Sequence, residues 1–134
     1  MSGRTVVSPD SQGAGRFTFS PGVVKEGGRL LFISGIMAVN ERGEVLAPGD
    51  IVGQTRIIYQ SMGRILEAAG ATFDDVVKTV DYITTADNYR ATADVRREFF
   101  KKDFPAATGV IVAGLLRPEA LIEIDAVAVI DGKI

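Results

Sequence analysis

The spacing of apolar residues predicts two amphipathic helices. After Asp50 these residues recur at the interval of one helix face, at Ile51, Ile58, Met62, Ile65, Leu66 and Ala69. Asp50 can accept backbone hydrogen bonds at the start of this helix, and Gly70 suits the left-handed position beyond its end. These limits predict a first helix of about five turns.

The second helix carries its apolar residues at Tyr89, Val95, Phe99 and Phe100. We expect Asp87 to cap its start and Pro105 to end its pattern. Glu98 and Lys102 are four residues apart, so we expect them to pair on the solvent-facing side.

Apolar and β-branched runs predict the strands. The runs 17–24 and 30–33 flank a Gly-Gly turn at 26–29, and together they predict a β-hairpin. Residues 40–43 (NERG) predict a second turn with a short strand on either side. The polar, glycine-containing residues 1–15 are expected to form an irregular lead-in.

Three more runs, 76–83, 109–115 and 121–130, predict strands, the last two joined by a turn through 117–119. The order of elements predicts an α+β fold in which a mixed sheet carries two helices on one face. Both alternating residue sets of the last two runs are mostly apolar. Because the helices can cover only one face, we expect the other face to be buried against another subunit.

Length and composition narrow the class of protein. At 134 residues and 46% hydrophobic, the chain 1–134 is expected to form one domain. It contains no His and no Cys, which excludes Ser-His-Asp triads, thiolate nucleophiles, Cys-ligated zinc and zincin motifs. Catalysis would therefore use carboxylates, Tyr, Lys, Arg, hydroxyl groups, backbone dipoles and water.

Charge and hydropathy argue against several partners. The net charge of −2 and the pI of about 5.1 disfavour nucleic acid. No stretch reaches the roughly 18 apolar residues of a membrane span, and the N-terminus lacks the apolar core of a secretory signal, so we expect a cytoplasmic protein. Gly13-Ala14-Gly15 neither follows a strand nor opens a helix, and we expect no nucleotide, other cofactor or metal.

Several segments, taken together, resemble one protein family. In chain order they are Phe32-Ile33-Ser34-Gly35, residues 65–70 (ILEAAG), Val76-Val77-Lys78-Thr79, Phe104-Pro105-Ala106 and Ile122-Glu123-Ile124-Asp125-Ala126. In this order and spacing they resemble the RidA family, also called YjgF, of imine/enamine deaminases. The resemblance covers nearly the whole chain. It implies a chorismate-mutase-like fold, a homotrimer, and three pockets for a small-molecule substrate, each between adjacent subunits.

The chain departs from the family where the substrate's carboxylate is recognised. Deaminating members carry Pro-Ala-Arg, whose Arg holds the carboxylate of a 2-imino acid through its planar fork. Here the Arg position is Ala107, and the position of a frequent Cys is Gly109. Loss of one partner of a buried charge pair typically costs about 2–5 kcal/mol. We therefore expect that the protein is not an ordinary 2-iminopropanoate deaminase. The backbone N–H groups of Thr108 and Gly109 can still bind a substrate oxygen.

The resemblance also implies the residues of the site. Glu123 aligns with a glutamate that positions or activates the hydrolytic water; the alternative is a solvated or salt-bridged strand residue. Ser34 and Gly35 align with a pocket-lining strand end; the alternative is a plain turn. Asp125 should share a sheet face with Glu123, where it can divide acid and base roles or, as we favour, form an intersubunit salt bridge.

Three further residues lie near the expected pocket rim. Phe17 is close to the position of a pocket-lining Tyr in many relatives, and otherwise belongs to a core or an interface. Arg16 and Arg117 are candidates to replace the missing Arg as the group that binds an anion. The alternative is that both are ordinary surface residues.

These features predict a divergent hydrolytic deaminase or lyase. It would act on an imine, enamine or related amino-substituted catabolic intermediate, with Glu123 activating water. The alternative is a non-catalytic trimeric protein that binds a small molecule or has a regulatory role. Ribonuclease activity, a label attached to the family, is disfavoured because the chain has no His and no basic aromatic stripe.

Overall fold

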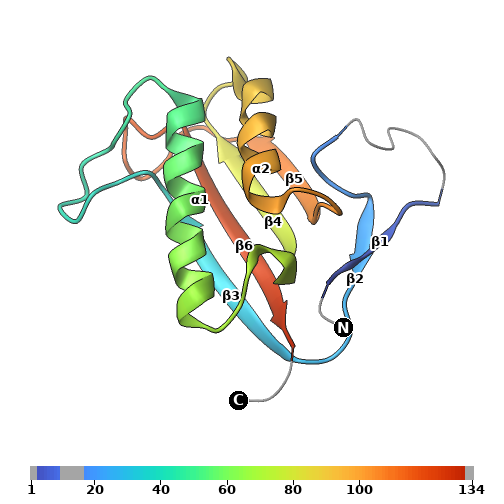
Figure 1. Cartoon of the computed structure of the whole chain (residues 1–134). Coiled ribbons are helices and arrows are strands. Elements are labelled where there is room, and N and C mark those ends of the chain that lie inside the picture. Colours follow the sequence, from blue (N-terminus) through green and yellow to red (C-terminus); the bar gives the residue numbers. More distant parts are fainter. Residues whose placement is uncertain (1–2, 10–16, 132–134) are drawn as a thin grey trace.

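The main sheet of the protein is mixed and carries its helices on one face (Figure 1). The computed structural model describes residues 3–9 and 17–131. The strands lie in the order β3 (Arg29–Ile36), β6 (Ile122–Ile130), β4 (Val76–Ile83) and β5 (Ala106–Ile111). Strand β6 is antiparallel to both of its neighbours, whereas β4 and β5 are parallel. The predicted α+β architecture is therefore confirmed.

Helix α1 (Ile51–Ala68) has the predicted position and caps. The carboxylate of Asp50 accepts a hydrogen bond from the backbone N–H of Gly53 at 2.9 Å. Gly70, beyond the other end, has the left-handed conformation with φ of +77°. The buried side of α1, including Ile58, Met62 and Leu66, packs on the sheet and forms the centre of the hydrophobic core.

Helix α2 (Ala93–Phe100) begins later than its apolar pattern suggested. A 3-10 turn, η2 (Tyr89–Thr92), precedes it, because Asn88 adopts a left-handed conformation that starts this turn. The prediction that Asp87 caps the helix is therefore wrong, since Thr92 occupies the cap position.

The predicted pair between Glu98 and Lys102 is also wrong. Helix α2 ends at Phe100, and the positive φ of Lys101 turns the chain away, so helical spacing does not continue to Lys102. Glu98 instead forms an ion pair across the helix layer with Arg56 of α1, at 2.6 Å. This bond lowers the pKa of Glu98.

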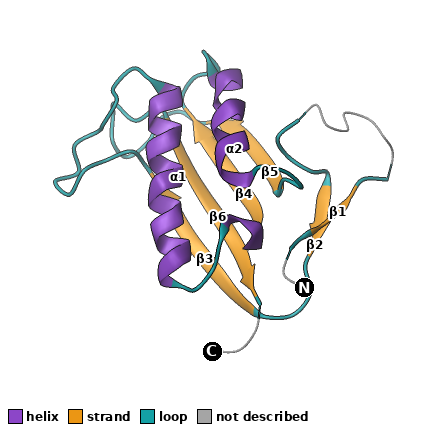
Figure 2. Cartoon of the chain, viewed as in Figure 1, coloured by secondary structure: helices purple, strands orange, loops and turns teal. Residues whose placement is uncertain are grey.

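The predicted hairpin between residues 17–24 and 30–33 is wrong. Strand β2 (Gly22–Val24) pairs with β1 (Thr5–Val7), which lies in the segment expected to be irregular, and the two form a small sheet beside the main one (Figure 2). Strand β3 pairs with β6 instead. Gly28 makes this possible, because it has φ of +95° and a Cβ there would lie 1.9 Å from the carbonyl oxygen of Ile130.

Two smaller predictions have mixed outcomes. The turn at residues 40–43 is confirmed, but its flanks pair only through a bridge between Val39 and Val45. Strand β5 runs from Ala106 to Ile111 rather than from 109 to 115, because parallel pairing with β4 already begins at Ala106.

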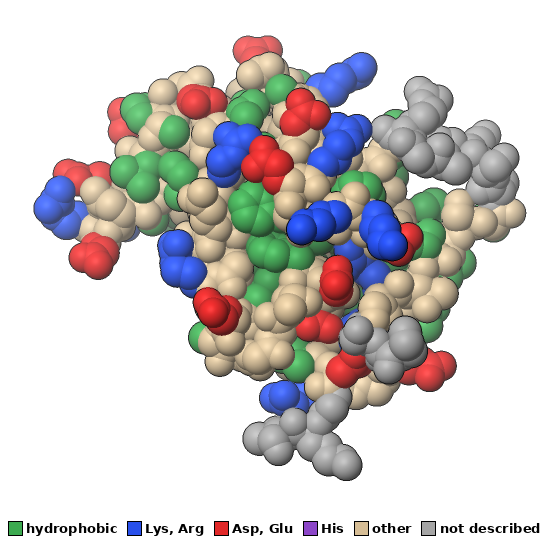
Figure 3. All heavy atoms as spheres, in the orientation of Figure 1, with side chains coloured by type: hydrophobic (Ala, Val, Ile, Leu, Met, Phe, Trp, Pro, Cys, Tyr) green, Lys and Arg blue, Asp and Glu red, His purple; other side chains and the backbone are tan. Residues whose placement is uncertain are grey.

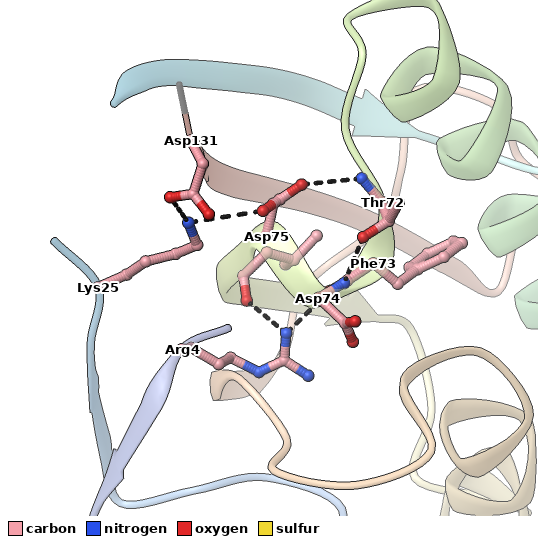
Figure 4. Close-up of polar contacts among 8 residues, drawn as sticks. Arg4, Lys25, Thr72, Phe73, Asp74, Asp75 and Asp131 are labelled. Atoms are coloured by element: carbon pink, nitrogen blue, oxygen red, sulfur yellow. Dashed lines mark hydrogen bonds and ion pairs between the residues drawn. The ribbon is translucent and has the colours of Figure 1, made fainter. Parts of the chain in front are cut away.

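Buried charges attach the β1–β2 arm to the body of the protein (Figure 4). The ammonium group of Lys25 lies 2.7 Å from a carboxylate oxygen of Asp131 and 3.5 Å from one of Asp75. Arg4 donates to the carbonyl oxygens of Phe73, at 2.8 Å, and Val76, at 3.2 Å. Burial lowers the pKa of Arg4. Satisfied bonds of this kind compensate for the removal of both cations from water.

The two faces of the main sheet differ in character. The outer surfaces of the helices carry interspersed acidic and basic side chains (Figure 3). The face without helices exposes large apolar side chains: Leu30 is 62% exposed and Phe32 is 71% exposed. Ile33, the next residue of β3, faces the helices and is buried. An exposed apolar face of this kind is typical of a surface that another protein covers.

Candidate functional site

A hollow of about 350 Å³ lies on the helix-free face of the sheet. It is lined by Gly35, Tyr82, Val112, Gly114, Leu115, Leu116, Glu123 and Asp125, and we refer to it as the carboxylate hollow. The polar residues come from neighbouring strands, because Tyr82 of β4 is the direct partner of Glu123 of β6. The apolar wall comes from the loop that follows β5.

Glu123 fits into this hollow because of a local irregularity in β3. The pairing of β3 with β6 shifts register between Ile33 and Ile36, which leaves Ser34 and Gly35 outside the regular ladder. A Cβ at position 35 would lie 2.0 Å from Oε2 of Glu123. The glycine therefore provides the space that the glutamate carboxylate occupies.

The two carboxylates of the hollow have different surroundings. Tyr82 donates a hydrogen bond of 2.9 Å from its hydroxyl to Oδ2 of Asp125, and this bond raises the pKa of Tyr82, with a further contribution from the charge of Glu123. Within the part of the chain that the structure describes, the Glu123 carboxylate has no hydrogen bond or ion pair. Glu123 is therefore free to bind and polarise a water molecule, whereas Asp125 is held by Tyr82.

Residues 107–109 belong to strand β5, which pairs with β4 and not with β6, the strand that carries Glu123. Strand β5 pairs with β4 so that Ala107 and Gly109 face the same side as the buried residues Thr79 and Asp81, which is the helix side. Thr108 faces the opposite side, where its hydroxyl accepts a hydrogen bond of 2.8 Å from Lys78. In one chain, Ala107 and Gly109 are thus on the other face of the sheet from Glu123.

Beside Gly109, a buried carboxyl and a tyrosine form what we term the Tyr89–Asp81 pair. The Tyr89 hydroxyl donates to Oδ2 of Asp81 at 2.6 Å, and a Cβ at Gly109 would lie 2.9 Å from that hydroxyl oxygen. Burial raises the pKa values of both members of the pair. Oδ1 of Asp81 has no hydrogen-bond partner among the described residues.

Arg96 is the cation next to this pair. It is buried, and it donates to the carbonyl of Thr18, to the Tyr59 hydroxyl and to the Thr79 hydroxyl, at 2.7–3.1 Å. Its charge partly offsets that of Asp81 and favours the ionised carboxylate, although desolvation outweighs it.

Two of the remaining predicted residues, Phe17 and Arg117, do not line the hollow. Phe17 stacks on Phe19 with ring centroids 5.0 Å apart, in the segment before β2. The guanidinium of Arg117 lies against Gly43 and does not line the hollow. Arg16 lies outside the described residues. Of the predicted set, the structure brings Gly35 and Glu123 together with Asp125.

Sequence reasoning missed Tyr82 and the apolar wall. Tyr82 faces Glu123 only through the register of β4 and β6, which the chain of residues does not reveal by itself. The signal available in the sequence was the alternation of side chains along this strand, which places Tyr82 on the opposite face from Asp81. Leu115 and Leu116 follow β5; the predicted strand 109–115 included Leu115 and ended just before Leu116.

Neither a three-ligand metal cluster nor a membrane-spanning helix occurs among the described residues. Residues 3–9 and 17–131 contain no group of three His, Cys, Asp or Glu side chains placed to hold a metal ion. No described helix combines the length and the apolar character that crossing a bilayer requires.

The fold and the hollow define a class of protein. A mixed sheet with two helices on one face and a small-molecule-sized hollow on the other is the chorismate-mutase-like α+β fold. The sequence model of the Endoribonuclease L-PSP family matches residues 13–130. The chain therefore belongs to this family, which is also known as YjgF/RidA. Its members bind small molecules and are usually oligomeric.

Solved structures agree with this assignment. The Rid-family protein YyfB of Yersinia pestis, whose function is unknown, is 34% identical, with a TM-score of 0.79 over 95% of this chain and 98% of that one. A YjgF-family protein of Mycobacterium tuberculosis is 29% identical, with a TM-score of 0.66 over 94% and 98%. RidA of an Antarctic Psychrobacter is 24% identical, with a TM-score of 0.69 over 94% of each chain, which shows the shared fold alone.

Proposed function

We propose that the protein is a divergent RidA-type deaminase that hydrolyses an imine, an enamine or a related amino-substituted intermediate of catabolism. The observation that carries this proposal is the Glu123 carboxylate, which has no hydrogen bond or ion pair among the described residues and lies against Gly35 in a hollow with an apolar wall. A carboxylate so placed can orient a water molecule and accept its proton.

The proposed reaction needs only this chain's residues and water. Glu123 accepts a proton from water as the water oxygen bonds to the imine carbon, and the C=N electron pair moves to nitrogen. Glu123 then returns this proton to nitrogen, which gives a carbinolamine. In the second step Glu123 accepts the hydroxyl proton and passes it to the amino nitrogen as the C–N bond breaks, so that the carbonyl forms and ammonia leaves. The sum is imine plus water giving carbonyl compound plus ammonia.

The proposal includes a cytoplasmic homotrimer whose pockets lie between subunits. Glu123 and Ala107 face opposite sides of the sheet in one chain, so they can meet the same ligand only if neighbouring copies supply them. One subunit would contribute the carboxylate hollow, with Ser34 at its edge, and the next would contribute Ala107, Thr108 and Gly109. The exposed apolar sheet face supports such an assembly.

Ala107 supports a substrate other than a simple 2-imino acid. It offers no guanidinium for a carboxylate, and Arg117 is engaged against Gly43. We therefore expect 2-iminopropanoate to be a poor substrate.

The test measures the hydrolysis of imines that an oxidase generates in situ from a panel of amino acids and amines. Semicarbazide traps the remaining imine as a semicarbazone, so faster hydrolysis appears as less semicarbazone. Wild-type protein should accelerate hydrolysis of at least one imine, and Glu123→Gln should lose about 100-fold or more of that rate while keeping its native mass. Glu67→Gln, on the exposed side of α1, is the matched control and should retain full activity. A Glu123→Gln protein as active as wild type would refute the proposal, and an inactive wild type would favour a non-catalytic binding protein.

A further inference from the structure

The groups that a ligand meets at Glu123 are hydrogen-bond acceptors. The carboxylate hollow contains the carboxylates of Glu123 and Asp125, and no Lys or Arg belongs to its described lining. Tyr82, the hydroxyl of that lining, already donates its proton to Asp125. Within one chain, the described lining of the hollow is therefore acidic.

The basic residues closest in the fold are directed elsewhere. Lys78 lies four residues before Tyr82 on β4, about 13 Å along the strand. Its ammonium group donates to Thr108. Arg117 lies against Gly43. Neither of them lines the hollow within one chain.

A second, independent observation comes from the β5 side, where a neighbouring subunit would complete the pocket. The side-chain space at Gly109 is taken by the Tyr89 hydroxyl, whose proton goes to Asp81. Asp81 is only 5% exposed, and its Oδ1 lacks a partner among the described residues. Arg96 is buried and donates to three other groups through Nε and Nη1, whereas its Nη2 has no partner among the described residues. The atom of the Tyr89–Asp81 pair that lies nearest to Gly109 of β5 is the Tyr89 hydroxyl oxygen. Because its proton is donated to Asp81, this oxygen can act toward a ligand only as a hydrogen-bond acceptor.

The rest of the hollow is apolar. Val112, Leu115 and Leu116 form its wall, and Leu116 is 91% exposed. A side chain of this size is available to pack on the apolar body of a ligand. The lining therefore suits a compound with an apolar part and an N–H-donating, positively charged head.

Building on the inter-subunit pocket of the proposed function, we propose that its ligand is a nitrogen cation without a carboxylate, a protonated imine on an apolar body. Its N–H groups donate to the carboxylates of the hollow and to the Tyr89 oxygen. A carboxylate on the ligand would add a like charge within about 5 Å of Glu123 and weaken binding by about tenfold or more. Positive charge also makes the imine carbon more susceptible to the water held by Glu123.

The test uses benzamidine and benzoate, planar probes of the same shape and opposite charge. Isothermal titration of the full-length protein should give a Kd for benzamidine at least about tenfold below that for benzoate. The double variant Glu123→Gln with Asp125→Asn should weaken benzamidine binding by about tenfold or more and remove the preference, and Asp125→Asn alone serves if the double variant fails to fold. Tyr89→Phe should weaken benzamidine binding to a smaller extent, and the Glu67→Gln control should leave both affinities unchanged.

Each outcome separates this inference from the proposed function. Failure of benzamidine to bind, or equal or tighter binding of benzoate, overturns the ligand class. Benzamidine binding that depends on both carboxylates, without hydrolysis of any imine, supports the ligand class and refutes the deaminase. Glu123-dependent hydrolysis of 2-iminopropanoate as fast as that of carboxylate-free imines supports the deaminase and overturns the ligand class.

Discussion

At the scale of single residues, the position of the Glu123 carboxylate depends on the missing side chain of Gly35. The irregular register of β3 brings the backbone of Gly35 against Oε2 of Glu123, while Tyr82 binds Asp125 and leaves Glu123 unbonded among the described residues. A glutamate at the same strand position beside any larger residue would have to point elsewhere. The reactivity proposed for Glu123 therefore requires a glycine as its neighbour.

Gly35→Ala should test this dependence. The new Cβ would lie 2.0 Å from Oε2 of Glu123, so the flexible carboxylate must move by an ångström or more. Misplacing a catalytic group on that scale costs about 10- to 100-fold in rate. We expect kcat to fall by this factor with little change in the unfolding midpoint. Gly3→Ala is the control, because its Cβ would meet no atom within 4 Å and Gly3 does not line the hollow; full activity of Gly35→Ala would contradict the placement.

At the scale of elements, local patterns predicted what local interactions determine. Helix α1 carries its own cap and apolar face, and β4 and β6 are long β-rich runs, so their bounds follow from neighbouring residues. The partner of β2 lies far upstream in β1, a three-residue strand in a polar segment, and no local pattern indicates it. For the same reason the sequence suggested Glu123 and Gly35 through a family resemblance, whereas Tyr82 required the observed register of β4 and β6.

The attachment of the β1–β2 arm through Lys25 gives a prediction at this scale. The Lys25 side chain is 2% exposed, and Lys25→Met would leave Asp75 and Asp131 without their cation. Breaking such a buried pair should destabilise the protein by about 2–4 kcal/mol, since Asp131 is partly exposed and Asp75 keeps its bond from the Thr72 N–H.

Urea unfolding at matched protein concentration measures this change, and hydrogen exchange should show faster exchange in β1 and β2. The control is Arg42→Met, which removes a solvent-exposed pair with Glu44 and should leave the free energy of unfolding nearly unchanged. Equal stability of the two variants would show that the Lys25 contacts do not hold the arm.

At the scale of the whole molecule, the exposed face of the sheet links assembly to activity. Leu30 and Phe32 project from β3 on the face that also carries the carboxylate hollow, and the helices cover only the other face. If three copies bury this face, the apolar contact both stabilises the assembly and brings β5 of one copy to the hollow of the next. Loss of the assembly should then abolish hydrolysis even though every residue of the site is intact.

Phe32→Glu tests that link directly. A glutamate in place of a phenylalanine that is 71% exposed in the single chain costs the fold little, but a charge buried without a partner at an interface is strongly unfavourable. By light scattering, wild-type protein should have the mass of three 14.3 kDa chains, and the variant that of one, with native circular dichroism and no imine hydrolysis. Ile65→Glu, on the exposed side of α1, should remain trimeric and active. A monomeric variant that still hydrolyses imines would place the whole active site within one subunit, and a wild-type monomer would remove the basis for a shared pocket.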